Sequence, residues 1–509
     1  MLNNDINKTN SINKNLSKKT KIIATLGPSS DSVEMIRKLY EEGMNVARLN
    51  FSHGSYGYFE KLIANVREVS DEITILLDTK GPEIRTSPID SQEDLNLDLN
   101  NEITLSNDIS KKSTSSLIQL DYKHLFEVKP NNMIFIDDGS IGIEVVSVSP
   151  EEKLVHGVIK IPGKLGSKKT VSIHGHNVNI PFLSQKDKED IKFGISQRVD
   201  LIAASFVRKE EDVIELENFL KDNGGEGIKI ISKIEHGEAL ENISGIIDRS
   251  FGIMVARGDL GVEAPIEKVP FIQERLIAMC NEFGKPVIVA TQMLESMKNS
   301  KVPTRAEVND VAQAILQGTD CIMLSGETAN GKYPEFAVSM MTKICNEYDP
   351  IVEGFIADSM NNSSKDSSGN ELSVTRKNQK EASLFVTKSA YYAARDLQAQ
   401  AILVPTESGF SARKISRFKP SCEILAVTKD MRVFRQLQMS WGVRPFIHLE
   451  EYADHDGMID ILVQELVSKN VLDEKRRVVI ASGKVVNKKG HTNTLEIYKV
   501  EDILERIPN

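Results

Sequence analysis

The chain has 509 residues, 40% of them hydrophobic and 27% charged, which is enough for about three domains with substantial cores. Its formal net charge of −10 and the lack of a long basic block give no reason to expect a nucleic-acid partner. No apolar run in the sequence approaches the roughly 18 residues that a membrane-spanning helix needs.

The cysteines and the N-terminal segment indicate the compartment. Cys280, Cys321, Cys345 and Cys422 are scattered and form no C-x-x-C pair, which predicts neither a zinc site nor a disulfide framework. Residues 1–17 are rich in Asn and Lys and lack the apolar core of a secretory signal, so we expect a disordered arm. The alternative is an organelle-targeting leader. This pattern favours a cytoplasmic protein.

From Lys21 onward a unit repeats: a short apolar strand, a small loop and an amphipathic helix. Helical patterns at 32–43, 211–224 and 304–318 are examples. Continuous apolar strands alternating with helices are typical of a parallel sheet that is covered on both faces. Eight such units predict an α/β protein built on a (β/α)₈ TIM barrel. The eight predicted strands are residues 21–27, 45–52, 74–81, 200–207, 228–235, 252–260, 286–293 and 321–327.

Two further domains are expected. Residues 86–181 read as short alternating strands and turns, so a β-barrel lid domain is predicted to be inserted after the third strand, at the end of the barrel where active sites form. The barrel domain then comprises residues 18–85 and 182–350. After a Ser- and Asn-rich linker at 359–382 the α/β pattern resumes, which predicts a C-terminal α/β domain over residues 351–509.

Charged side chains stand where two central strands end. Lys233 and Glu235 are two residues apart and therefore share one face of their strand, and Asp259 follows the next strand. Carboxylate oxygens suit a hard divalent ion such as Mg²⁺, which one or two carboxylates hold while substrate oxygens complete its shell. The alternative for Lys233 and Glu235 is a solvated surface ion pair. Their apolar flanks argue for a site.

Other strand ends add oxygen donors and positive charge. Asn50, Ser52, Asp78 and Thr79 carry one formal negative charge among them, which suits a monovalent cation better than Mg²⁺. Arg48, Arg85 and Lys233 supply cations for phosphate oxygens. Two kinds of metal ion with a cationic clamp are typical of phosphoryl transfer. No P-loop and no kinase-type Gly-rich loop is present, so a nucleotide must be held in another way.

Eight segments make the resemblance specific. They are TKIIATLGPSS, GMNVARLNFSHG, LLDTKGPEIRT, IISKIE, GIMVARGDLG, VIVATQMLESM, PTRAEVNDVA and CIMLSGETANGKYP. In this order they resemble the signature segments of the pyruvate kinase family, and the match extends over nearly the whole chain from Lys18. The family also carries an inserted domain after its third strand. The resemblance implies transfer of a phosphoryl group from phosphoenolpyruvate to ADP, giving pyruvate and ATP in glycolysis.

The resemblance also implies roles for single residues. Lys233 would neutralise the transferred phosphoryl group and Arg48 would contact the phosphate. Thr291 and Ser325 would belong to the water-linked path that protonates the enolate. The resemblance implies further that the substrate carboxylate binds Thr291 and the amides of Arg257 and Gly258, and that Mg²⁺ or Mn²⁺ binds Glu235 and Asp259. It implies that K⁺ binds Asn50, Ser52, Asp78 and Thr79. It also implies that the nucleotide contacts Asn50, His53, Arg85 and Lys169.

One residue places this chain within the family, and two features depart from the family pattern. Glu83 resembles the K⁺-dependent members, since K⁺-independent members carry Lys there; the alternative is a solvated carboxylate. Residues 170–175 read TVSIHG where the family more often has GVNLPG, so closure of the lid could differ. His236 stands where Asn is common, which leaves a metal role for this histidine open.

The C-terminal domain has its own anion-binding candidate in a loop between a strand and a helix. Thr406, Ser408, Gly409 and Ser411 resemble the sugar-phosphate effector loop of the family. An ordinary helix N-cap without a ligand is the alternative. Because Glu407 would repel an anion where activated members often have Lys, we expect fructose 1,6-bisphosphate to be a poor activator, and a smaller sugar monophosphate remains open.

Two other functions are weighed against the kinase. A barrel lyase or mutase acting on an oxoacid through Mg²⁺ would share Glu235 and Asp259 but would need neither the K⁺ ligands nor the lid. A catalytically silent metabolite sensor would have lost Lys233 or Asp259, and the chain retains both. The family resemblance implies a homotetramer with phosphoenolpyruvate, ADP, ATP and pyruvate as partners.

Overall fold

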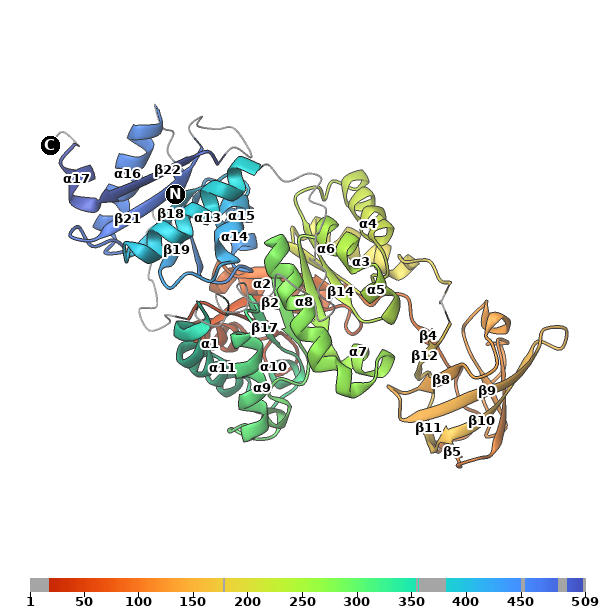
Figure 1. Ribbon diagram of the computed structural model, residues 1–509. Coiled ribbons are helices and arrows are strands. Elements are labelled where there is room, and N and C mark those ends of the chain that lie inside the picture. Colours follow the sequence, from red (N-terminus) through yellow and green to blue (C-terminus); the bar gives the residue numbers. More distant parts are fainter. Residues whose placement is uncertain are drawn as a thin grey trace.

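The computed structural model describes residues 18–176, 179–353, 356, 381–449, 454–483 and 492–506. A central barrel domain lies between the C-terminal domain on one side and the inserted β domain on the other (Figure 1). The expected N-terminal arm (1–17), residues 359–380 of the expected linker and residues 484–491 lie outside the described residues.

The predicted (β/α)₈ barrel is confirmed. Eight parallel strands close in the order β1-β17-β16-β15-β14-β13-β3-β2. Almost every residue of these strands is buried, because helices cover the outer face and side chains fill the interior. The strands are β1 (Lys21–Thr25), β2 (Met44–Asn50), β3 (Thr74–Asp78), β13 (Leu201–Ala204), β14 (Lys229–Ile234), β15 (Gly252–Ala256), β16 (Val287–Ala290) and β17 (Cys321–Leu324).

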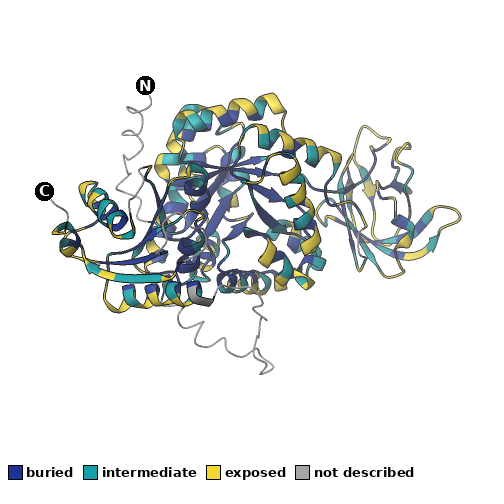
Figure 2. Ribbon diagram, turned by 90° about the horizontal axis from the view of Figure 1, so that it is seen from above, coloured by how far each residue is buried: buried dark blue, intermediate teal, exposed yellow. Residues whose placement is uncertain are grey.

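Amphipathic helices surround the barrel, with buried faces inward and exposed faces outward (Figure 2). Their ends follow local sequence signals: Ser184 and Thr304 begin two helices as capping boxes, and Gly284 ends another in the left-handed conformation. The helices are α1 (Val33–Glu42), α2 (Tyr56–Val69), α3 (Gln185–Ser196), α4 (Glu210–Asp222), α5 (Gly237–Glu241), α6 (Ile243–Arg249), α7 (Arg257–Glu263), α8 (Val269–Phe283), α9 (Arg305–Leu316), α10 (Gly326–Ala329) and α11 (Pro334–Tyr348).

The barrel strands end earlier than predicted. The sixth was expected to reach residue 260, but β15 ends at Ala256 and Arg257 begins α7. Asp259 therefore stands in the first turn of a helix, where the helix dipole favours a negative side chain. The polar groups predicted at strand ends mostly lie in the following turns, because a side chain that binds a ligand must project beyond the covered part of the sheet.

The inserted β domain follows β3, as predicted. Its strands form one seven-stranded sheet in the order β4-β12-β8-β9-β10-β6-β7 and a separate pair, β11-β5, around their own apolar cluster. The strands are β4 (Ile84–Arg85), β5 (Leu95–Leu97), β6 (Glu102–Ser106), β7 (Leu117–Gln119), β8 (Met133–Ile136), β9 (Ile141–Ser149), β10 (Leu154–Ile161), β11 (Gly163–Leu165) and β12 (Thr170–His174).

The C-terminal domain is a five-stranded sheet, β20-β19-β18-β21-β22, with apolar clusters on both faces. It also completes the floor of the barrel, since Met439 is fully buried in the cluster inside the barrel and its carbonyl accepts the Cys321 thiol. The elements are α13 (Glu381–Asp396), β18 (Ala401–Pro405), α14 (Phe410–Ser416), β19 (Glu423–Thr428), α15 (Met431–Leu437), β20 (Val443–Ile447), α16 (His455–Ser468), β21 (Arg477–Ser482), β22 (Thr494–Lys499) and α17 (Val500–Leu504).

A search of the described residues for membrane spans found no helix with the length and apolar character to cross a bilayer.

Candidate active site

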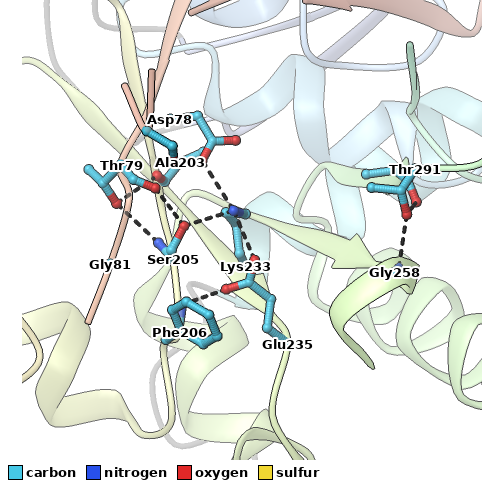
Figure 3. Close-up of polar contacts among 12 residues, drawn as sticks. Asp78, Thr79, Gly81, Ala203, Ser205, Phe206, Lys233, Glu235, Gly258 and Thr291 are labelled. Atoms are coloured by element: carbon cyan, nitrogen blue, oxygen red, sulfur yellow. Dashed lines mark hydrogen bonds and ion pairs between the residues drawn. The ribbon is translucent and has the colours of Figure 1, made fainter. Parts of the chain in front are cut away.

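The ammonium group of Lys233 lies at the centre of a buried polar cluster (Figure 3). Its Nζ is 3.1 Å from Oδ1 of Asp78, 2.7 Å from Oγ of Ser205 and 2.8 Å from Oε1 of Glu235. Burial alone would lower the pKa of Lys233, but the two carboxylates outweigh it and raise this pKa above its usual value. With 12% of the side chain exposed, the pair with Glu235 is not a solvated surface pair.

Asp78 fixes two cations. Its Oδ2 accepts from Nε of Arg48 at 2.6 Å, and Arg48 also donates from Nη1 to Oγ1 of Thr25 at 2.8 Å. Burial would raise the pKa of Asp78, but the charges of Arg48 and Lys233 together lower it. The carboxylate is therefore ionised and holds both cationic side chains in place.

Glu235 and Asp259 form an acidic pair beside Lys233. Oε2 of Glu235 accepts from the Phe206 amide at 2.6 Å, and Phe206 has a positive φ of 55°. Burial raises the pKa of both carboxyls, that of Glu235 to about 7, and each acid lies close enough to Lys233 to feel its charge. The described residues hold no group of three or more His, Cys, Asp or Glu side chains arranged around a metal, so a divalent ion here would rely on two carboxylates and substrate oxygens.

A cleft opens between the mouth of the barrel and the inserted domain. It contains about 830 Å³ of empty space, including its opening to solvent, and both Glu235 and Asp259 line it. The inserted domain contributes Phe135, Thr170 and Ser172 to the same cleft. The predicted lid therefore faces the acidic pair.

Thr291 directly follows β16, and its backbone is strained. It has φ 67°, which is rare for a β-branched residue, and the next residue also has a positive φ. Its Oγ1 accepts from the Gly258 amide at 2.9 Å (Figure 3). The Arg257 side chain turns away to Asp310 at 2.7 Å, which leaves only its backbone amide for a ligand. Ser325 follows β17, and its amide donates to Glu327.

Among the four expected K⁺ ligands, Asn50, Asp78 and Thr79 make hydrogen bonds through their side chains, and Ser52 makes one through its backbone amide. Asn50 and Asp78 are register partners on β2 and β3, and Oδ1 of Asn50 accepts from the Ser52 amide at 3.1 Å. Oγ1 of Thr79 donates to the Ala203 carbonyl and accepts from the Ser205 amide. These are neutral oxygens with spare lone pairs around one ionised carboxylate, which fits a monovalent cation.

The expected nucleotide residues Asn50, His53, Arg85 and Lys169 are not among those that line this cleft. His53 is exposed in the loop after β2. Arg85 donates from both Nε and Nη2 to Glu83, whose carboxylate also pairs with Lys80 at 3.3 Å, so Glu83 is not merely solvated. Nζ of Lys169 is 3.0 Å from Asp137 within the inserted domain.

His236 and His174 both lie near the boundary between the inserted domain and the barrel, and the charge of His174 acts on His236. Nδ1 of His236 accepts from the Glu238 amide, and its Nε2 is 3.4 Å from Glu263. Burial first, then nearby cationic groups, lower the pKa of His236 to about 4. His174 at the end of β12 is close enough to contribute to that shift. His236 thus begins α5 as its N-cap.

The expected effector loop forms a tight turn before α14. Gly409 has φ 71° and donates its amide to Oγ1 of Thr406 at 3.0 Å. Ser408 is exposed and its carbonyl accepts from Arg413, while Ser411 is buried against Thr492. Glu407 is exposed, so its carboxylate is accessible to an anion that approaches this loop, as the expected repulsion requires.

Ser205 and Thr25 also contact the proposed site residues, and the sequence did not predict them. Ser205 comes directly after β13 and bonds Lys233 and the Thr79 carbonyl, while Thr25 ends β1 and orients Arg48. Both stand at the carboxyl ends of barrel strands, which is the signal that could have identified them.

Models of two domains match the chain. The model described as "Pyruvate kinase, barrel domain" matches residues 17–338, and the one described as "Pyruvate kinase, alpha/beta domain" matches residues 385–498.

Individual relatives agree. Pyruvate kinase of Dictyostelium discoideum is 41% identical over 493 residues, which cover 96% of this chain and 95% of the relative. That of Clostridium acetobutylicum is 40% identical over 490 residues, covering 95% and 100%. A crystal structure of a pyruvate kinase from Cryptosporidium parvum superposes with a TM-score of 0.86 at 34% identity, covering 95% of this chain and 96% of that one.

Proposed function

The chain belongs to the pyruvate kinase family, and from this membership we propose that it transfers the phosphoryl group of phosphoenolpyruvate to ADP, giving pyruvate and ATP in glycolysis. The observation that carries the proposal is Lys233, held among Asp78, Ser205 and Glu235 beside Asp259 at the mouth of the barrel. It supports an electrophilic mechanism, in which charge neutralisation and positioning lower the barrier.

In this mechanism a β-phosphate oxygen of ADP attacks phosphorus, and the bond from phosphorus to the enol oxygen breaks. Lys233 and Arg48 offset the negative charge of the transferred group, and Asp78 orients both because it bonds each of them. The enolate left behind takes a proton at its methylene carbon. Thr291 and Ser325 are proposed to hold the water that delivers this proton.

The substrate carboxylate is proposed to lie at the start of α7. The amides of Arg257 and Gly258 point from the first turn of this helix, where the dipole favours an anion. Thr291 already accepts from the Gly258 amide and is therefore within reach of the same ligand.

The donor set fits the expected cations. We propose that Glu235 and Asp259 hold Mg²⁺ or Mn²⁺, and that Asn50, Ser52, Asp78 and Thr79 hold K⁺. Both ions would neutralise phosphate and carboxylate charge when bound. Asn50, His53, Arg85 and Lys169 are proposed to meet the nucleotide from the rim of the cleft.

A coupled assay tests the function. Pyruvate formation from phosphoenolpyruvate is expected to require both ADP and a divalent cation, and to fall strongly when K⁺ is replaced by a bulky organic cation. A lyase or mutase would form product without ADP. A silent paralogue would bind phosphoenolpyruvate in a calorimeter without turnover, and either result would end the proposal.

We also propose a cytoplasmic homotetramer. Ile266 and Phe271, around the start of α8, are 77% and 69% exposed, which is unusual for large apolar side chains and supports a subunit contact there. Sedimentation equilibrium of the full chain measures the state directly.

A further inference from the structure

A small cavity lies between the loop from α8 to β16 of the barrel and the C-terminal domain. The C-terminal domain lies on the opposite side of the barrel from the inserted domain (Figure 1). It contains about 180 Å³ of empty space, including its opening to solvent, and Lys285 of the barrel lines it together with Arg413 and Ser440 of the C-terminal domain. Lys285 stands in the loop from α8 to β16, and Arg413 lies on α14.

Cationic groups gather at this cavity, which Lys285 and Arg413 line, and beside it, where Lys414 follows Arg413, and carbonyl oxygens are their partners. Nζ of Lys285 donates to the carbonyls of Asp248 at 2.8 Å and Ser250 at 2.6 Å. Arg413 donates to the Ser408 carbonyl at 3.0 Å and stacks over Phe251, and Lys414 donates to the Phe283 carbonyl. Within the part of the chain that the structure describes, these three cations make no ion pair.

Burial of like charges that make no ion pair is costly, and the pKa values of these groups reflect it, although the charge of Asp248 partly offsets the effect on both lysines. Burial lowers the pKa of Arg413 to about 10, and burial is also the largest cause of the lowered pKa of Lys285 and of Lys414. The pKa of Lys285 falls to about 8, and that of Lys414, which also faces Arg417, Lys285 and Arg413, falls to about 7.

The carboxylate that lines the cavity does not neutralise this cluster. Oδ1 of Asp320 accepts from Lys419 at 2.9 Å and from the Trp441 amide at 3.0 Å, and its Oδ2 accepts from the Val287 amide at 3.1 Å. The hydrogen bonds and the ion pair of Asp320 are therefore made to other groups at the boundary between the two domains.

A second observation points to a ligand. Ser440 lines the same cavity and is 1% exposed, and its Oγ has no hydrogen-bond partner within the described residues. A buried hydroxyl without a partner is uncommon in folded proteins. A hydroxyl donor beside a lysine and an arginine is a suitable set of donors for an anion.

We infer that this cavity binds a single small inorganic anion, which bridges Lys285 of the barrel and Arg413 of the C-terminal domain and accepts a hydrogen bond from Ser440. The bound anion supplies the direct ion-pair partner that these cations lack among the described residues, and it joins the two domains. The site is separate from the catalytic cleft and does not depend on the proposed reaction. It adjoins the loop at Thr406, because Arg413 also donates to the Ser408 carbonyl of that loop.

Crystals of the full chain soaked in bromide test the site directly. An anomalous peak between Lys285, Arg413 and Ser440 is expected. If bromide occupies only the catalytic cleft, the effector loop or the outer surface, the proposal is wrong.

A solution measurement uses the melting temperature at constant ionic strength and constant K⁺. Replacing potassium gluconate with potassium chloride is expected to raise the melting temperature of the wild type by about 1–3 °C. Arg413→Gln and Ser440→Ala are expected to lose most of this shift. Arg395→Gln, an exposed arginine on α13 that pairs with Asp396, is the matched control and should keep it. An equal shift in all four proteins would overturn the inference, and the soaked wild-type crystal decides the matter if a variant fails to fold.

Discussion

Asp78 contacts both cations that are proposed to meet the phosphoryl group, so the position of one carboxylate sets the position of Arg48 and Lys233 together. Removing Lys233 leaves the Arg48 pair with Asp78 intact. The two functions of the site, binding the substrate and stabilising the transferred group, can therefore be separated by mutation.

Lys233→Met is expected to reduce kcat by about 10³-fold, since a preorganised charge at the reacting group is lost. The KM for phosphoenolpyruvate should change only a few-fold, because Arg48 and the start of α7 remain. The coupled assay gives both constants, and calorimetry gives the affinity. Unchanged turnover would refute the role of Lys233.

Ser205→Ala is expected to lower kcat about tenfold with little change in KM, because Ser205 holds Lys233 and the Thr79 carbonyl in register. Ser232→Ala is the control, since Ser232 lies next to Lys233 on β14 but bonds Ser250. Equal losses in both variants would mean that Ser205 acts only through stability.

Residue identities could be predicted where charge interrupts an apolar strand, as at Lys233, Glu235 and Asp259. Ser205 could not, because one hydroxyl at the end of an apolar run is unremarkable in sequence. Its partner Thr79 directly follows β3 and becomes its neighbour only when β3 pairs with β13 across the insertion. Contacts of this kind need the topology.

At the scale of elements, the strand and helix types follow from periodicity, while their ends do not. β15 and β17 were predicted too long because polar residues after a strand can either continue it or begin a helix. An acidic residue in the first turn favours a helix, and Asp259 in the first turn of α7 is such a signal, although α7 has no side-chain cap. The helices that begin at Ser184 and Thr304 carry a stronger signal, because each starts with a capping box.

Thr291 joins two such elements, because its hydroxyl holds the start of α7 against the end of β16. Thr291→Ala is expected to reduce kcat at least tenfold, whereas Thr291→Ser should retain most activity because it keeps the hydroxyl and relieves the β-branched strain at positive φ. Steady-state kinetics of the two variants side by side provide the comparison. Equal activity of alanine and serine would contradict it.

The whole molecule depends on the seam between barrel and C-terminal domain. Met439 fills the barrel floor, and Nζ of Lys21, at the start of β1, donates to the Val443 carbonyl of the C-terminal domain at 2.7 Å. The domain order along the chain was predictable from sequence, but this seam was not. Its contacts join residues that no local pattern relates.

Lys21 makes stability depend on pH. Burial lowers its pKa from 10.5 to about 7 in the folded chain, so the unfolded chain binds more protons between these values and the free energy of unfolding should rise with pH through that window. Lys21→Met should flatten this rise and add about 1–2 kcal/mol near pH 7, since it replaces a buried cation with an apolar side chain of similar length. Urea unfolding at pH 7 and 9 measures both, and an unchanged slope would contradict the assignment.

Regulation also belongs to this scale. Because Glu407 is exposed beside the expected effector loop, fructose 1,6-bisphosphate is expected to activate poorly, and Glu407→Lys should increase its effect. Activity at half-saturating phosphoenolpyruvate, titrated with the bisphosphate, provides the test. Strong activation of the wild type at micromolar concentration would contradict the expectation.

The inserted domain separates β3 from its barrel neighbour β13 along the chain. During synthesis on the ribosome, β1, β2 and β3 therefore emerge first, and β13, the barrel neighbour of β3, emerges only after the whole insertion has left the exit tunnel. The insertion has its own apolar cluster, so it can fold while those early strands still lack a neighbour. Nascent chains stalled before residue 200 should accordingly present a protease-resistant insertion attached to an unfinished barrel.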